Sequence, residues 1–299
     1  MKTSLLMSAL LAAGLTAGRP AAPPSFSYPD GVAVDAAGNV YVVDTDNGAV
    51  QKVSPTGEVS LVVNTDLSYP TGVAVSATGL VYVADAGSHS IKQVSAAGKV
   101  TTLVQSHSLV YPAAVAVDAE GNVYVADTGA GPNTGSVQKI TPRGGISTLA
   151  SGLNKPAGIA VSAHGTVYVA DTDNNTIREI SLTGQVHLLA DDFNHPRGLA
   201  VEADGGVLVA DTYSNCIRRV SPTGEVTLLA EGFKFPAGVA TDGTGAVYVT
   251  DTGSGTLRKI SPTGQVSTLA NTPTATNSAD TAVIDSVRNS KVIGSAAKQ

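Results

Sequence analysis

Apolar residues alternate with small or polar residues in short runs that return along most of the chain. In residues 156–190 two such runs cover 158–161 and 166–170, with the period of two that half-buried strands show. Two more follow at 177–180 and 185–190. Several units join the last two runs by Ser-Pro-Thr-Gly, where proline presets φ and glycine allows a positive φ. The pattern predicts an antiparallel meander of four strands.

This unit occurs six times. The prolines that lead the units are spaced by 41, 42, 44, 40 and 40 residues, and they are Pro29, Pro70, Pro112, Pro156, Pro196 and Pro236. An aspartate closes the second run of every unit, at Asp44, Asp85, Asp127, Asp171, Asp211 and Asp251. A period near 40 with two markers in step indicates one repeated supersecondary unit rather than unrelated domains.

A single meander cannot bury both of its apolar faces, so the units must stack on one another. A straight stack needs polar units at its ends, yet the first and last units are as apolar as the inner ones, which favours a closed ring. We therefore predict an all-β protein, a six-bladed β-propeller of four-stranded antiparallel blades over residues 28–270, with repeats starting near 29, 70, 112, 156, 196 and 236.

The two ends of the chain differ from the repeats. Residues 1–18 hold one lysine and an apolar stretch, 5–17, that is short for a bilayer span, so they predict a secretory signal peptide; an uncleaved anchor is the alternative. Residues 19–27 are expected to form a flexible lead, and residues 271–299, rich in Asn, Thr, Ala and Ser, a disordered tail whose apolar segment 281–287 could add an edge strand. We therefore expect a secreted or periplasmic protein that has no stable membrane span once the leader is removed.

Composition limits the partners. The formal net charge is -6, which argues against nucleic-acid binding, where a basic face supplies most of the affinity. Cys216 is the single cysteine, so no intramolecular disulfide is possible, and it is expected to be a partly exposed free thiol in a loop. We expect a monomer.

The repeated pattern Pro-x-Gly-(Val/Ile)-Ala-Val, Gly-x-Val-Tyr-Val-Ala-Asp and (Ile/Val)-(Arg/Lys)-(Lys/Arg)-(Ile/Val) resembles the NHL repeat, over residues 29–270. Propellers of this kind include extracellular sensor domains of bacterial receptor kinases, RNA- and protein-binding modules, and a peptide amidating lyase, with streptogramin lyases and lactonases as more distant relatives. The resemblance implies that the first strand of each unit lines the central channel. It also implies that the loops after the second and fourth strands form the binding face.

Two columns of residues vary around the ring, directly before and directly after the leading proline. Both should lie near the channel mouth, aromatic on units one to three and basic on units four and five. Aromatic surfaces with a few polar groups are typical of ligand sites, although such rings can also simply pack against the next blade. The predicted ligand-binding rim consists of Tyr28, Asp30, Tyr69, Tyr111, Lys155, His195, Arg197 and Phe235.

Asp30 and Arg197 are the one unusual charged pair of this rim. Arg197 is expected to be an exposed charge that binds an anionic ligand or a carboxylate, and its loss should leave the melting temperature nearly unchanged.

Signals for catalysis and for metals are weak. The six aspartates suggest a metal ring, but a role repeated six times is a fold requirement, and an aspartate at a strand end accepts backbone hydrogen bonds from its loop. His164 falls in a turn of the opposite face and His187 within a fourth strand. Only His89, His107 and His195 can reach the binding face, without the spacing of a zinc set. No catalytic residue, metal ligand or cofactor is predicted.

The sequence thus favours a non-catalytic module that binds another protein or a small anionic ligand through its loop face. The alternative is a propeller enzyme of lyase or lactonase/hydrolase type with its site at the channel mouth. An enzyme should gather titratable groups or a metal at the mouth, whereas a binding module should show an open aromatic funnel.

Overall fold

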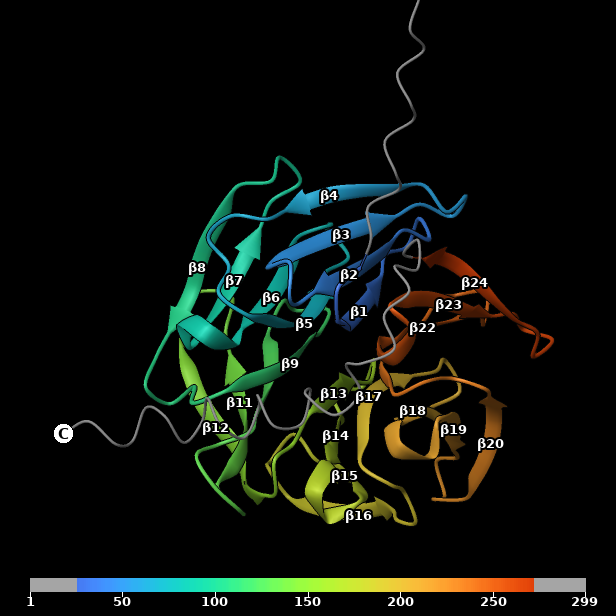
Figure 1. Cartoon of the computed structure of the whole chain (residues 1–299). Coiled ribbons are helices and arrows are strands. Elements are labelled where there is room, and N and C mark those ends of the chain that lie inside the picture. Colours follow the sequence, from blue (N-terminus) through green and yellow to red (C-terminus); the bar gives the residue numbers. More distant parts are fainter. Residues whose placement is uncertain (1–25, 272–299) are drawn as a thin grey trace, which may run out of the picture.

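The fold was obtained as a computed structural model, and it describes residues 26–271. These residues form six sheets, each of four antiparallel strands that follow one another in chain order (Figure 1). The prediction of an all-β six-bladed propeller is confirmed. The predicted signal peptide, most of the lead and all but the first residue of the predicted tail lie outside the described residues.

The first half of the ring contains three blades. Blade 1 comprises β1 (Pro29–Val34), β2 (Val40–Asp44), β3 (Ala49–Val53) and β4 (Val59–Val63). Blade 2 comprises β5 (Pro70–Val75), β6 (Val81–Asp85), β7 (Ser90–Val94) and β8 (Val100–Gln105). Blade 3 comprises β9 (Pro112–Val117), β10 (Val123–Asp127), β11 (Gly135–Ile140) and β12 (Ile146–Leu153).

Three further blades complete it. Blade 4 comprises β13 (Gly158–Val161), β14 (Val167–Asp171), β15 (Thr176–Ile180) and β16 (Val186–Ala190). Blade 5 comprises β17 (Pro196–Val201), β18 (Val207–Asp211), β19 (Cys216–Val220) and β20 (Val226–Glu231). Blade 6 comprises β21 (Pro236–Thr241), β22 (Val247–Asp251), β23 (Thr256–Ile260) and β24 (Val266–Asn271).

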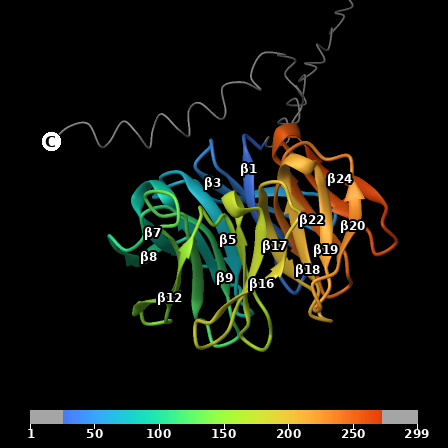
Figure 2. The same ribbon diagram turned by 90° about the horizontal axis from the view of Figure 1, so that it is seen from below.

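Single turns of 3-10 helix follow the second strand in four blades: η1 (Ala86–Ser88), η2 (Thr172–Asn174), η3 (Thr212–Ser214) and η4 (Thr252–Ser254). Figure 2 shows these turns together at the upper end of the ring, which is the loop face. Helices of this length within residues 26–271 cannot span a membrane.

The first strands surround the axis, and each contacts the first strand of the next blade, including β21 with β1, so the ring is closed (Figure 1). The core lies between the blades. For example, Ile91 of blade 2 packs with Val125 and Ile140 of blade 3, and all three are fully buried. Burying a side chain of this size contributes roughly 1.5–3 kcal/mol. Each blade therefore depends on its neighbours for stability, as the repeat pattern required.

The six aspartates at the ends of the second strands accept backbone hydrogen bonds, as predicted, but the donor common to all six is not in the predicted loop. Each accepts a hydrogen bond from the backbone N–H of the residue two before the leading proline, for example Ser27 to Asp44 at 2.6 Å and Asn194 to Asp211 at 2.6 Å. The main backbone donor thus comes from the segment that leads into the blade rather than from the following loop. Burial raises the pKa of the Asp44 and Asp127 carboxyls, although the hydrogen bonds they accept oppose this shift.

Threonines hydrogen-bond neighbouring blades together. In blades 3 to 6 the threonine that follows the capping aspartate donates to the carbonyl of the next leading proline: Thr128 to Pro156 at 3.3 Å, Thr172 to Pro196 at 2.8 Å, Thr212 to Pro236 at 2.8 Å and, across the closure of the ring, Thr252 to Pro29 at 2.6 Å. The hydroxyl of Thr45 in blade 1 does not make this bond. Blade 2 has Ala86 at this position, and there Thr71 donates to Pro112 at 2.9 Å instead. The closure between blades 6 and 1 therefore uses the same bond as the interfaces that follow blades 3, 4 and 5.

Glycine is required where the first strands come closest to one another. A Cβ atom added to Gly158 would overlap the carbonyl oxygen of Arg197 in the next blade. We expect Gly158→Ala to destabilise the protein by about 1–3 kcal/mol, since overpacking forces the blades apart. Urea unfolding followed by circular dichroism measures this. Gly131→Ala is the matched control, because nothing lies within 4 Å of its added Cβ. Equal stability of the two variants would contradict the expectation.

Candidate functional site

The channel narrows to a cavity of about 50 Å³ lined by the beginnings of the first strands. Asp30 of β1 and Arg197 of β17 meet in this cavity, and one guanidinium nitrogen of Arg197 lies 2.9 and 3.0 Å from the two carboxylate oxygens of Asp30. Blade 6 lies between blades 1 and 5 in the ring, so the ion pair connects two blades that are not neighbours. The side chains are only 8% and 14% exposed. The expectation of an exposed charge at Arg197 is wrong, because Asp30 holds it in the channel.

Thr250 of β22 anchors the backbone of Asp30. Its hydroxyl donates to the Asp30 carbonyl at 2.5 Å and accepts from the N–H of Gly238 at 2.7 Å. Sequence reasoning missed this residue. The sequence did distinguish Thr250, because it is the polar residue directly before the capping aspartate, where the other units carry Val43, Ala84, Ala126, Ala170 and Ala210. Blade 6 therefore holds one side of the ion pair without contributing a charge.

The rim residues before the prolines share a backbone conformation. Five of the six have a positive φ, between 49° and 64°: Tyr28, Tyr69, Lys155, His195 and Phe235. A conformation found in five units is a requirement of the propeller, and it fixes where each side chain starts. On blades 2 and 3 the rings of Tyr69 and Tyr111 lie 6.5 Å apart, tilted by 56°. The sequence-predicted rim residues thus form separate groups.

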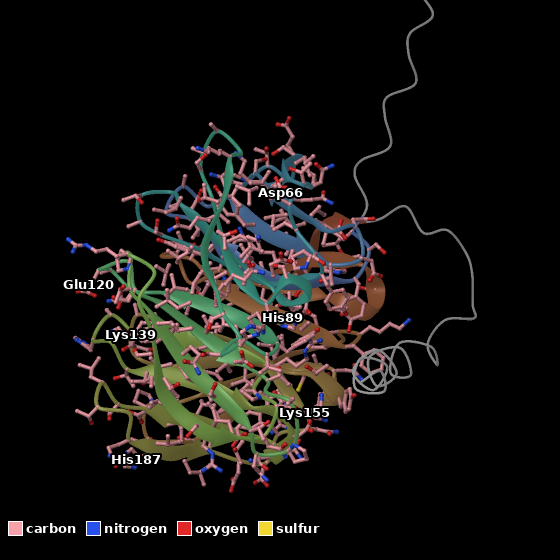
Figure 3. The ribbon with its side chains drawn as sticks, turned by 90° about the vertical axis from the view of Figure 1, so that its left-hand side faces the viewer. Asp66, His89, Glu120, Lys139, Lys155 and His187 are labelled. Carbon is pink, nitrogen blue, oxygen red and sulfur yellow. The ribbon has the colours of Figure 1, made fainter. Side chains whose placement is uncertain are left out.

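A charged group lies on the other side of the mouth. Asp173 is 2.8 Å from the ammonium nitrogen of Lys155 and 3.7 Å from Nδ1 of His195, one oxygen to each. Asp173 comes from η2 of blade 4, and His195 leads into blade 5. Figure 3 shows Lys155 toward the same end of the molecule as His89, with Glu120 and Lys139 toward the opposite end.

The imidazole of His195 also stacks on Tyr213, with ring centroids 4.6 Å apart and an angle of 7° between the planes. Tyr213 in turn meets Phe235 edge to face, at 6.0 Å and 85°. Sequence reasoning missed Tyr213, which lies in η3. The sequence did distinguish Tyr213, because it is the aromatic residue at the second position after the capping aspartate, where the other units carry Asp46, Gly87, Gly129, Asp173 and Gly253.

The other histidines take no part in this group. Nδ1 of His89 lies 2.8 Å from the carbonyl of Val110, and His187 is on β16, at the outer edge of blade 4 (Figure 3). Among residues 26–271, no three His, Cys, Asp or Glu side chains come together in a metal-binding group. Asp30 is the one acid among the residues that line the cavity, and both its oxygens contact Arg197. The cavity lining does not fit a metal ion.

Cys216 is not in a loop. It is the first residue of β19 and is only 5% exposed, so the expectation of a partly exposed thiol is wrong. Burial raises the pKa of the thiol, which makes it a poor nucleophile at neutral pH.

Solved structures of other proteins share the fold. Virginiamycin B lyase from Staphylococcus aureus is 17% identical, with 85% of this chain and 86% of that chain covered and a TM-score of 0.61. A gluconolactonase from Xanthomonas campestris is 17% identical, with 82% and 87% covered and a TM-score of 0.69. A chain of a nidogen/laminin complex is 21% identical, with 76% and 91% covered and a TM-score of 0.68. At these identities the likeness shows the fold alone.

A search of curated proteins found no match. Among family models, that of the NHL repeat matches residues 26–53, which confirms the repeat type, and that of the virginiamycin B lyase family matches residues 61–288. This second match contradicts the expectation of a non-catalytic binding module and favours the alternative, a propeller enzyme. Since it covers well over half of the sequence, the chain belongs to the virginiamycin B lyase family.

Proposed function

We propose that this protein is a lyase that opens a cyclic ester at the channel mouth on its loop face. The observation that carries the proposal is the pairing of His195 with Asp173, in a chain of the virginiamycin B lyase family. A cavity of about 50 Å³ is far below the several hundred Å³ of a ligand pocket, so the substrate would lie over the mouth rather than inside the channel.

In an elimination, a base removes a proton from the carbon next to the one that carries the ester oxygen. The released electron pair forms a carbon–carbon double bond, the carbon–oxygen bond breaks, and the ester oxygen leaves in a carboxylate. His195 is the proposed base. Asp173 would stabilise the imidazolium that forms, since one of its oxygens lies 3.7 Å from Nδ1.

Arg197 follows His195 by two residues and is fixed by its contacts with Asp30. Its positive charge would favour the negative charge that develops on the departing carboxylate. The role of Arg197 in this proposal therefore replaces the predicted role as an exposed anchor for an anion, because its guanidinium acts from the fixed position in which Asp30 holds it in the channel.

The direct test is to incubate the purified protein with quinupristin, a cyclic peptide ester that is bound to a catalytically inactive virginiamycin B lyase variant in one similar structure. We expect a ring-opened product with the same mass as the substrate, since elimination adds no water. Mass spectrometry after separation of the products measures this.

A product heavier by one water molecule would instead identify a hydrolase, the function favoured by the likeness to the gluconolactonase, and gluconolactone should then be tested in parallel. Failure to open either ring, with the protein folded as judged by circular dichroism, would contradict the proposed activity.

A further inference from the structure

Three large apolar side chains are exposed on β16 and the turn that leads into it, at the outer edge of blade 4. Leu182 is 65% exposed, Val186 39% and Leu188 52%. The same edge of blades 1 and 5 exposes one leucine each, Leu61 and Leu228. Single exposed leucines are common on soluble proteins, whereas a group of three along one edge is typical of an interaction site.

The blade does not require these side chains. At the position of Leu188, blades 2, 3 and 6 carry threonine, and at the position of Leu182 four units carry proline. Val186 is exposed, whereas the valine or isoleucine at its position in the other five units is half-buried. The strand itself reads Val-His-Leu-Leu-Ala and has no Lys, Arg, Asp, Glu or Pro, the residues that usually keep an open edge from pairing.

The backbone of β16 is also open on one side, because this strand is the last of its sheet and lies on the outside of the ring (Figure 1). The N–H of Ser181 donates to the carbonyl of Gln185 at 2.9 Å, and bonded positions alternate along an antiparallel pair. His187 therefore bonds to β15, and the N–H and C=O groups of Val186 and Leu188 point outward. A bulge ends the regular edge after Leu188.

We propose that two copies of this protein pair through β16, antiparallel and centred on His187, to form a two-fold symmetric dimer in place of the expected monomer. In this register Val186 of each copy lies opposite Leu188 of the other, and both pairs exchange hydrogen bonds through the groups that point outward. The four apolar side chains then gather on one face of the joined sheet, and the two imidazoles meet on the other.

The edge favours a second copy as its occupant because it is complementary to itself. A two-fold rotation about His187 exchanges the apolar residues on its two sides, so each copy supplies what the other needs. The charges agree with this register. Each copy carries a net charge of -6, but Glu179 lies opposite His187 on β15, so the imidazoles at the centre separate the two carboxylates of this row.

The dimer is tested by sedimentation velocity of the purified full-length protein over a range of concentrations. We expect the molar mass to rise from one copy towards two. Leu188→Lys should raise the dissociation constant about tenfold or more, because each copy loses an apolar contact and gains a like charge at the joined edge. Leu61→Lys is the matched control, the same change at the same position of blade 1, and should leave the dissociation constant within about twofold.

His187→Cys tests the register. Directly opposite residues of a non-hydrogen-bonded antiparallel pair have Cα atoms about 4.5 Å apart, which a disulfide can span. Oxidised glutathione should therefore link two copies of this variant, as measured by electrophoresis without reductant. The native Cys216 is buried and should not react. Ser60→Cys, at the equivalent position of blade 1, is the control and should stay unlinked.

A molar mass of one copy at every concentration would overturn the dimer. Equal dissociation constants for folded Leu188→Lys and Leu61→Lys would show that β16 is not the interface. Equal linking of His187→Cys and Ser60→Cys would show that the disulfides come from random collisions. The inference goes beyond the proposed function, since β16 lies away from the channel mouth and none of these measurements uses a substrate.

Discussion

Replacing Arg197 by alanine is expected to lower the free energy of unfolding by about 3–5 kcal/mol. The side chain of Arg197 is 14% exposed and that of Asp30 is 8% exposed, so removal of the arginine leaves the charge of Asp30 buried and unpaired. Such a loss costs much more than the loss of a surface ion pair, which is worth about 0–1 kcal/mol. Chemical denaturation followed by circular dichroism at neutral pH measures the change.

The other units of the repeat show that alanine is compatible with this position, which justifies it as the replacement in a control variant. At the position after the leading proline, blades 3, 4 and 6 carry Ala113, Ala157 and Ala237. The double variant Asp30→Ala with Arg197→Ala removes both charges, and it should be more stable than either single variant, because no charge is left buried without its partner. A stability of Arg197→Ala equal to that of the original protein would contradict the buried pair.

Replacing His195 by alanine is expected to reduce kcat of ring opening by about 10²- to 10⁴-fold, the usual contribution of a positioned general base. The variant should keep its fold, since the imidazole lies on the loop face and touches Asp173 and Tyr213 rather than the core. Rates at saturating substrate measure the effect. Added imidazole should restore part of the lost rate in His195→Ala, which a purely structural role would not allow.

His187→Ala is the matched control for this change. His187 is an exposed histidine on β16, away from the mouth, and its removal should leave kcat within about twofold of the original value, as for other surface substitutions. A rate for His195→Ala as high as that for His187→Ala would exclude His195 as the base.

The sequence predicted the blades well because the residues that specify each blade lie close together in the sequence. Alternation and turn residues specify the strands within about 40 residues, and the predicted strand 158–161 matches β13, while the run 166–170 differs from β14 by one residue at each end. The caps were also predictable, since six copies of Asp44 and its equivalents showed that the role belongs to the fold.

The site was harder to predict because it depends on contacts between blades. Asp30 and Arg197 stood out in their column, but they are 167 residues apart, and nothing in the column shows that they meet in the channel. The role of Thr250 appears only when blade 6 lies beside blade 1, and that of Tyr213 only when blade 5 lies beside blade 6. The functional interpretation went wrong because a missing local catalytic motif was treated as a sign of binding alone, although chemistry on a propeller face is assembled from separate loops.

The manner of ring closure has a mechanical consequence. No strand is shared between the first and last blades, since β1 to β4 and β21 to β24 each form a complete sheet. The closure is held by side-chain packing and by bonds such as that of Thr252 to the Pro29 carbonyl. The ring is thus closed by non-covalent contacts alone, and the two ends of residues 26–271 lie at this closure, where Phe26 packs in one cluster with Ala270. Tension applied between those ends acts first on the contact between blades 6 and 1. Each blade that then unfolds releases about 140 Å of extended chain, at about 3.5 Å for each of its roughly 40 residues.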